Sequence, residues 1–172
     1  MTRPQRNNNP LNIRHSSDSW EGACEEQTDK AFVQFKSLAY GYRAAWKVLE
    51  SYWKHFHKES LPFNVKNIIG RWAPPTENDT QAYIRTVLKL SGLGGNENLP
   101  QPSRKVDVER LERLVRAMTV VESGIPLDKV RMRAIRQGYQ LAFPGRQSYA
   151  RTKPVEEIDW EKFLIWDEYR DW

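Results

Sequence analysis

The sequence predicts a mainly helical domain of α+β class, with a small β-hairpin lobe and a C-terminal extension. Three observations support this prediction. Apolar residues recur at spacings of three and four along several stretches, as on one face of an α-helix. Segments rich in Gly, Pro and Asn separate these stretches and favour turns. The beginning of the chain is turn-rich and then alternates, which is typical of a short strand pair.

The composition is that of a folded protein with one core. The chain has 172 residues, of which 39% are hydrophobic and 28% charged, so it is not a disordered chain. The net charge of +5 favours an acidic partner, either an anionic polymer or nucleic acid. The single cysteine, Cys24, excludes an internal disulfide framework and a multi-cysteine zinc site. The sequence indicates no metal site and no cofactor.

The first residues, MTRPQRNNNP, lack the apolar core of a signal peptide. No apolar run in the chain is long enough to span a bilayer. We therefore expect a protein without a membrane span that is cytoplasmic as synthesised.

The domain is predicted to cover residues 1–144, beginning with a small lobe at 6–36. In this lobe, Phe32 and Phe35 flank Val33 and Gln34 in the alternation of a hairpin. A helical core follows at 37–91. Its first helix, at 37–58, has seven apolar residues at spacings of one, three and four: Tyr42, Ala45, Trp46, Leu49, Tyr52, Trp53 and Phe56.

Two shorter helices complete the helical core. One begins after Asn64, a favoured N-cap residue, and ends where Ala73 precedes two prolines. The next runs from 78 or 79 to 91, and Gly92 suits its left-handed C-terminal cap. A linker at 92–104 then permits a change of direction.

The remaining predicted helices lie at 105–143. Asp107 is the expected N-cap of the first, which ends at Ser123 and Gly124 before Pro126. The second is predicted from 128 to about 143. Residues 145–172 form a tail with five basic and seven acidic residues and a cluster of aromatic side chains. We expect this acidic aromatic tail to dock on the basic body, although binding to a partner protein is the alternative.

A glutamate ends the apolar face of the helix at 105–124. Four residues follow one another there at spacings of four, three and four: Leu111, Val115, Met118 and Glu122. A carboxyl on an apolar face near the negative end of a helix dipole favours its neutral form, which a general acid requires. The alternative is that Glu122 only ends its helix in solvent or pairs with an arginine.

The segment around Glu122 resembles a known catalytic motif. The run AMTVVESG, followed by Pro126, is similar to the helix of lytic transglycosylases and related glucosaminidases, in which an apolar helix ends in Glu-Ser. The resemblance implies that Glu122 is the general acid/base of glycan-strand cleavage.

A second resemblance covers about residues 6–143. It is carried by RNNNPLNIR at 6–14, Trp20, FVQF at 32–35, and IIGRWAPPTENDTQAYI at 68–84. These runs look like a family of phage and prophage lysozyme-like or "structural" proteins. The family has Gly where Leu11 stands and Asn where Ser123 stands, and these departures weaken the transfer of activity more than that of fold.

This second resemblance implies a lysozyme-like fold acting on peptidoglycan. Because the glutamate helix follows the cleft segment here and precedes it in transglycosylases, we infer a circular permutation that packs RNNNPLNIR beside Glu122. The implied substrate-binding residues are Asn8, Asn9, Asn12, Arg14, Trp20, Asn78 and Tyr83. Core packing is the alternative for Tyr83, and turn formation is the alternative for the asparagines.

Glu77, in the segment PPTEN, is the second catalytic candidate. It can serve as a second carboxylate or only organise the cap of the following helix. The expected partners are peptidoglycan glycan strands and phage virion proteins, with nucleic acid the less favoured partner. The protein would act at the cell wall or in a virion after delivery there. A non-catalytic structural or glycan-binding protein that keeps the fold is the alternative function.

Overall fold

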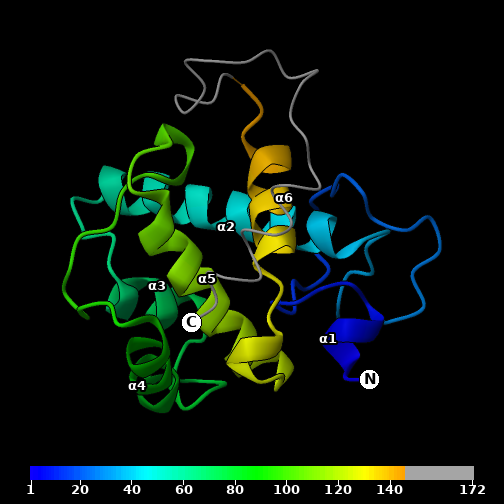
Figure 1. Cartoon of the computed structure of the whole chain (residues 1–172), viewed down its shortest axis with the longest axis horizontal. Helices are drawn as coiled ribbons and strands as arrows, with labels where there is room; N and C mark the ends of the chain where they lie inside the picture. Colours follow the sequence, from blue (N-terminus) through cyan, green and yellow to red (C-terminus); the bar gives the residue numbers. More distant parts are fainter. Residues whose placement is uncertain (146–172) are drawn as a thin grey trace.

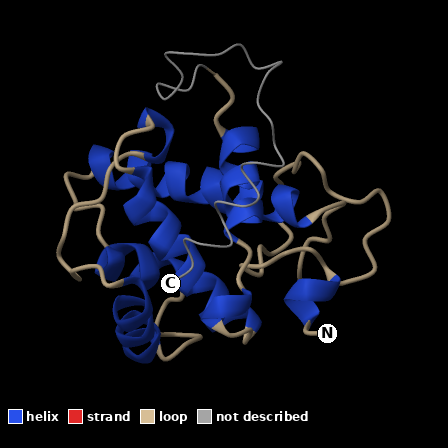
Figure 2. Cartoon of the chain, in the orientation of Figure 1, coloured by secondary structure: helices blue, strands red, loops and turns tan. Residues whose placement is uncertain are grey.

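The computed structural model describes residues 1–145, and helices dominate this part of the chain. Figure 1 follows their order and Figure 2 colours them by type. The elements are α1 (Arg3–Arg6), α2 (Leu38–Lys58), α3 (Val65–Trp72), α4 (Thr80–Ser91), η1 (Pro102–Arg104), α5 (Val108–Ser123), η2 (Leu127–Lys129) and α6 (Met132–Ala142). The mainly helical class is therefore confirmed.

Local sequence signals set the ends of α3 and α4. The side chain of Asn64 accepts a hydrogen bond of 2.9 Å from the Asn67 amide and caps α3. Asp79 caps α4 in the same way by accepting from Ala82 at 3.0 Å. Gly92 ends α4 with a φ of 68°, in the left-handed region that glycine adopts without strain.

The core is built around the contact between α2 and α6, which cross in Figure 1. Trp46 of α2 is fully buried and donates from its indole nitrogen to the Ile135 carbonyl at 3.0 Å. The two helices approach closely at Gly138 of α6. A Cβ at this position would lie 2.5 Å from the Tyr42 Cβ and 2.8 Å from the Arg43 amide nitrogen. Any side chain larger than hydrogen would therefore push the helices apart.

The apolar face of α5 packs into the same core, as its spacing predicted. Leu111, Val115 and Met118 are each 0% exposed, and α4 lies against the same helix. This face leads directly to Glu122 in the last turn.

The N-terminal lobe differs from the predicted hairpin. Within the described residues it contains two isolated antiparallel bridges, Arg14 with Phe32 and Ala23 with Phe35, and no strand. Single backbone hydrogen bonds cross the lobe, from the Val33 amide to the Ile13 carbonyl at 3.0 Å and from the Cys24 amide to the Gln34 carbonyl at 2.9 Å, and side-chain amides add to them. Gln27 donates to the Gln34 carbonyl at 2.8 Å and accepts from its amide at 2.7 Å. The lobe is thus held by scattered backbone hydrogen bonds together with side-chain to backbone bonds, and these do not form a regular ladder.

One buried acid ties the start of the chain to this lobe. Asp29 accepts two hydrogen bonds of 2.7 Å from the Arg3 guanidinium and another of 2.7 Å from Asn7. The Arg3 guanidinium, followed by the Asn7 amide, holds the pKa of the Asp29 carboxyl well below its usual range. The lobe therefore keeps a charged anchor at neutral pH.

The helix predicted from 128 to 143 is shorter than expected. Residues 127–129 form the 3-10 turn η2, and α6 begins only at Met132. Between them Val130 is 2% exposed in extended backbone, with φ −72° and ψ 121°. The chain leaves the helical conformation where this valine enters the core.

The predicted docking of the tail concerns residues 146–172, which lie outside the described residues. No helix of the described part is both long and apolar enough to cross a membrane.

Candidate functional site

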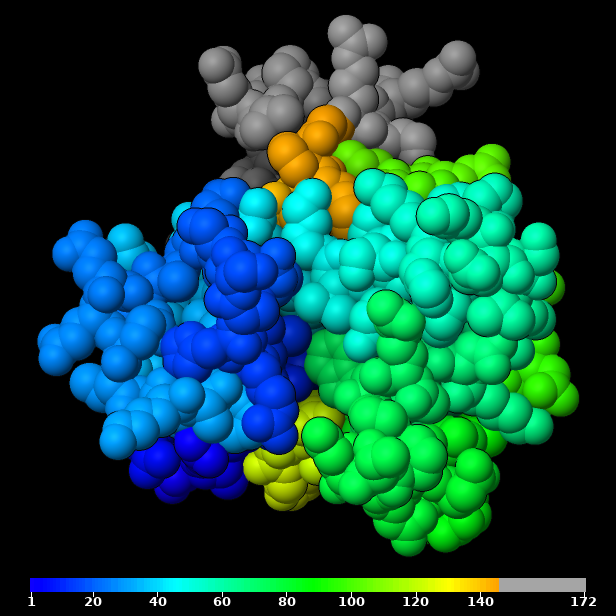
Figure 3. Space-filling model, turned by 180° about the vertical axis from the view of Figure 1, so that it is seen from behind, coloured from blue at the N-terminus to red at the C-terminus, as the bar shows by residue number. Residues whose placement is uncertain are grey.

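Glu122 stands in the last turn of α5, just before the left-handed cap at Gly124. Its side chain is partly buried. In the space-filling view, yellow atoms of the segment from the end of α5 to η2 are visible between the blue N-terminal segment and a green segment (Figure 3). The carboxyl group thus lies where three parts of the chain meet.

Three side chains donate hydrogen bonds to the Glu122 carboxylate. The indole nitrogen of Trp72 and the hydroxyl of Tyr83 both donate to Oε1, at 3.0 Å and 2.9 Å. Asn12 Nδ2 donates to Oε2 at 3.0 Å. Oε1 therefore accepts two hydrogen bonds and Oε2 accepts one, so Oε2 is the oxygen with more capacity to exchange a proton with a ligand.

Each of the three donors comes from a different segment of the chain. Trp72 is the last residue of α3, and Tyr83 lies on α4 with 8% of its surface exposed. Asn12 adopts a φ of 54°, a left-handed conformation that asparagine tolerates. Its Nδ2 also donates to the Glu122 backbone carbonyl at 3.2 Å, which has no helical partner at the end of α5. Asn12 therefore brings the N-terminal segment beside Glu122.

All three donors to Glu122 are neutral side chains. Burial, reinforced by the neighbouring Glu122 carboxylate, raises the pKa of Tyr83 well above its ordinary value. The phenol consequently keeps its proton at neutral pH and remains a donor. Within the described residues no ion pair involves Glu122, and no group of three or more His, Cys, Asp or Glu could hold a metal ion.

A second aromatic ring extends the site away from the carboxylate. Tyr52 of α2 meets Trp72 edge-on, with ring centroids 6.1 Å apart and planes at 68°. The guanidinium of Arg71 lies 5.1 Å from the centre of the Tyr52 ring. Burial raises the pKa of Tyr52, against the opposing effect of Arg71, so this phenol is also protonated at neutral pH.

No family model matches the sequence. The chain is 35% identical to Protein P5 of Pseudoalteromonas phage PM2 over 143 residues, which cover 81% of each protein. It belongs to the P5 family. The phage origin of this relative agrees with the expected phage source.

Two of the predicted substrate-binding asparagines of this P5-family protein have structural partners. Asn9 is 0% exposed and donates to the carbonyls of Ile13 and Val33 at 2.9 and 2.8 Å. Asn8 donates to the Phe35 carbonyl at 3.1 Å. Both amides organise the lobe and so fix the path of the chain toward Asn12.

The other predicted site residues make no hydrogen bond to Glu122 in the described part of the chain. Arg14 is exposed, with its guanidinium 5.2 Å from the centre of the Phe32 ring. Glu77 and Asn78 are exposed in the turn before α4, where Asn78 donates to the Pro74 carbonyl at 3.4 Å. Trp20 is partly buried, packed against a cluster of buried residues that includes Ile13, Val33 and Phe35.

Sequence reasoning missed two residues of this P5-family site. Trp72 and Tyr52 both lie on apolar helical faces, so their spacing indicated core packing. Trp72 belongs to both the core and the site, because its ring packs on the core while its indole nitrogen donates to Glu122. Trp72 and Glu122 are 50 residues apart in sequence, so no local sequence pattern indicates that their side chains meet.

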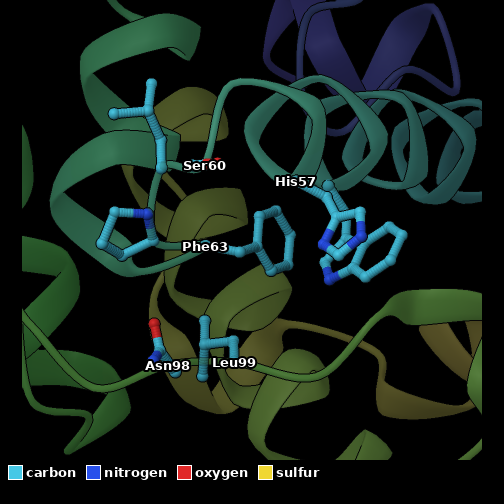
Figure 4. Close-up of a pocket in the computed structure, with 8 residues that line it drawn as sticks. His57, Ser60, Phe63, Asn98 and Leu99 are labelled. Carbon is cyan, nitrogen blue, oxygen red and sulfur yellow. The ribbon is translucent and has the colours of Figure 1, made fainter.

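A separate hollow of about 350 Å³ opens at the end of α2. Figure 4 shows His57 and Phe63 on either side of it, with Asn98 and Leu99 at its edge. The His57 ring is stacked on Trp53 with centroids 4.7 Å apart. None of the residues that line this hollow donates to Glu122, so it is distinct from the carboxylate site.

Proposed function

We propose that this protein cleaves the glycan strands of peptidoglycan, with a circularly permuted lysozyme-like fold and Glu122 as general acid/base. The observation that carries the proposal is the setting of Glu122. A partly buried carboxyl at the end of α5 is held by neutral donors from three distant segments. One donor, Asn12, belongs to the RNNNPLNIR segment on which the family resemblance rests.

The proposed reaction begins with a proton on Glu122. Oε2 gives this proton to the glycosidic oxygen as the bond between that oxygen and the anomeric carbon breaks. Asn12, Trp72 and Tyr83 then stabilise the negative charge left on the carboxylate. Glu122 finally takes a proton from the group that attacks the anomeric carbon, either water or a hydroxyl of the sugar itself.

Glu77 is the candidate second carboxylate, and its exposure in the turn before α4 leaves it accessible to a bound strand. A route through the sugar's own hydroxyl needs Glu122 alone, whereas a hydrolase with two carboxylates needs a partner. Substitution of Glu77 therefore distinguishes the two routes.

The two residues that depart from the family pattern make no hydrogen bond to the Glu122 carboxylate in the described structure. Leu11 stands in the place of glycine, but its φ is not positive and its side chain is buried at 1% exposure. Ser123 donates to the Thr119 carbonyl at 2.6 Å within α5. Leu11 thus serves packing, and Ser123 bonds within the last turns of α5.

The test is release of muropeptides from purified peptidoglycan by the wild type, Glu122→Gln and Glu77→Gln. Glu122→Gln is expected to lower the rate at least about 100-fold, because general acid/base catalysis contributes that much or more. Mass analysis of the product ends identifies hydrolysis or transglycosylation. Far-UV circular dichroism and thermal unfolding check that each variant folds.

The second candidate is a virion structural protein that keeps the fold and binds glycan without turnover. The phage origin of the P5 relative favours it. In that case the wild type releases nothing from any wall type, while Glu122→Gln binds glycan strands as the wild type does.

A further inference from the structure

Arg71 is a cation whose charge is not paired within the described structure. Its side chain is exposed at the end of α3, and no ion pair among residues 1–145 includes it. Its guanidinium lies 5.1 Å from the centre of the Tyr52 ring. An aromatic face under an arginine restricts its motion and leaves the N–H groups at the rim free to bind an anion.

Tyr52 connects this cation to the proposed catalytic carboxylate. Its ring meets Trp72 at 6.1 Å, and Trp72 donates to Glu122 Oε1 at 3.0 Å. Arg71 and Tyr52 therefore lie beside the carboxylate site.

Arg71 and Tyr52 together present hydrogen-bond donors to a ligand, and neither side chain carries a negative charge at neutral pH. A guanidinium presents a fixed fork of N–H groups, and a protonated phenol adds one O–H. The Tyr52 hydroxyl makes no hydrogen bond with another described residue. Planar donors of this kind match a carboxylate, which accepts charge-assisted hydrogen bonds at both oxygens.

We propose that Arg71 and Tyr52 bind a carboxylate of the substrate strand next to the bond that Glu122 cleaves. This inference rests on the proposed function and defines its substrate class as an anionic glycan. The carboxylate belongs either to a lactyl ether on the sugar or to a peptide attached to it. Neutral strands of N-acetylglucosamine lack both groups and would bind without this contact.

The first experiment measures binding in a Glu122→Gln background, so that turnover does not consume the ligand. Three ligands are compared: peptide-bearing glycan strands, strands stripped of peptide by an amidase, and neutral chitooligosaccharides. Stripped strands carry lactyl carboxylates, so they separate that source from the peptide carboxylates. Arg71→Gln removes the charge, and Tyr52→Phe removes only the hydroxyl while keeping the ring against Trp72.

Arg71→Gln is expected to raise the Kd for at least one anionic ligand by roughly tenfold or more, because hydrogen bonds to charged groups are strong. Tyr52→Phe should raise the same Kd by a smaller factor. Neither change should alter the Kd for chitooligosaccharides. Arg85→Gln is the matched control, since Arg85 is an exposed arginine of α4 with no ion pair among the described residues.

An Arg71→Gln variant that binds all three ligands as its parent does, or that weakens neutral and anionic ligands equally, overturns the inference. Absence of binding to any strand overturns it as well. Failure of the proposed function has a different signature, because the wild type then releases no muropeptides while the Arg71-dependent preference for anionic strands persists. A wild type that cleaves neutral and anionic strands with equal KM leaves the proposed function intact and removes only this inference.

Discussion

At the scale of single residues, each carboxylate oxygen of Glu122 accepts at least one hydrogen bond, and the rest of its helical face packs in the apolar core. Leu111, Val115 and Met118 fill the core on the same helical face. A carboxyl group there would be costly to bury without partners, and three donors supply them. Because these donors carry no charge, they orient the carboxylate without neutralising it.

Loss of a single donor should therefore impair catalysis beyond any effect on stability. Tyr83→Phe removes the hydroxyl that lies 2.9 Å from Oε1 and keeps the ring on α4. We expect kcat to fall roughly 10- to 100-fold, since a hydrogen bond to a charged group contributes about 1.5–3 kcal/mol. Muropeptide release measured across a range of pH checks this, because a change in the orientation or charge of Glu122 alters the pH profile.

Tyr139→Phe is the control for that experiment. Its hydroxyl also donates a hydrogen bond, to the Pro102 carbonyl at 2.6 Å, but its partner belongs to η1 and not to the site. It should lower stability and leave the pH profile of the reaction unchanged. Equal effects of the two substitutions on kcat would contradict an orienting role for Tyr83.

At the scale of elements, the contact of α2 with α6 depends on the absence of a side chain at Gly138. The Cβ of an alanine would lie 2.5 Å from the Tyr42 Cβ, closer than packed carbons approach. Gly138→Ala should therefore cost about 1–3 kcal/mol in the free energy of unfolding, the usual cost of overpacking.

Urea unfolding checks this prediction, with Gly70→Ala as its control. Gly70 lies in α3, and a Cβ there would meet nothing within 4 Å. Because alanine favours a helix over glycine, Gly70→Ala should stabilise the protein by about 0.5–1 kcal/mol. A Gly138→Ala variant as stable as the wild type would show that the helices separate without cost.

The sequence could predict those elements whose ends depend on local interactions. The ends of α3 and α4 follow from Asn64, Asp79 and Gly92, whose effects depend only on nearby backbone. The predicted hairpin is not confirmed, because the backbone bonds of the lobe are scattered and Gln27 bonds to both backbone groups of Gln34, which alternation does not reveal. The start of α6 was misplaced because burial of Val130 is a tertiary effect.

The candidate site likewise has one residue that local sequence indicates and others that depend on tertiary packing. A carboxylate on an apolar face is visible in the spacing of α5, so Glu122 could be identified from sequence. The donors Trp72 and Tyr83 lie on apolar faces that look like ordinary core. Their meeting with Glu122 depends on how three helices pack, and no local pattern encodes that.

At the scale of the whole molecule, buried tyrosines make stability depend on alkaline pH. Burial raises the pKa of Tyr42 and of Tyr139 to about 12, and that of Tyr83 and Tyr52 above its ordinary value. In the unfolded chain these phenols ionise near pH 10, while the folded protein keeps them protonated. Their contribution to stability is thus complete below about pH 10 and is lost as the pH rises further.

Urea unfolding midpoints between about pH 8 and pH 12 check this expectation, together with absorbance of ionised tyrosine. The midpoint should stay level up to about pH 10 and then decrease, with tyrosine absorbance appearing as the protein unfolds. Ionisation of every tyrosine near pH 10 without unfolding would contradict the burial described above.

The three donors to Glu122 lie 39, 50 and 110 residues away from it in sequence. Contacts between residues so far apart in sequence close long loops. They form late in folding, because the chain loses the entropy of loop closure before the contact stabilises it. During synthesis from the N-terminus, Asn12, Trp72 and Tyr83 all leave the ribosome before the carboxylate that they bind. A nascent chain that ends before α5 thus holds the donors without their acceptor, and the site is completed only after α5 has been synthesised.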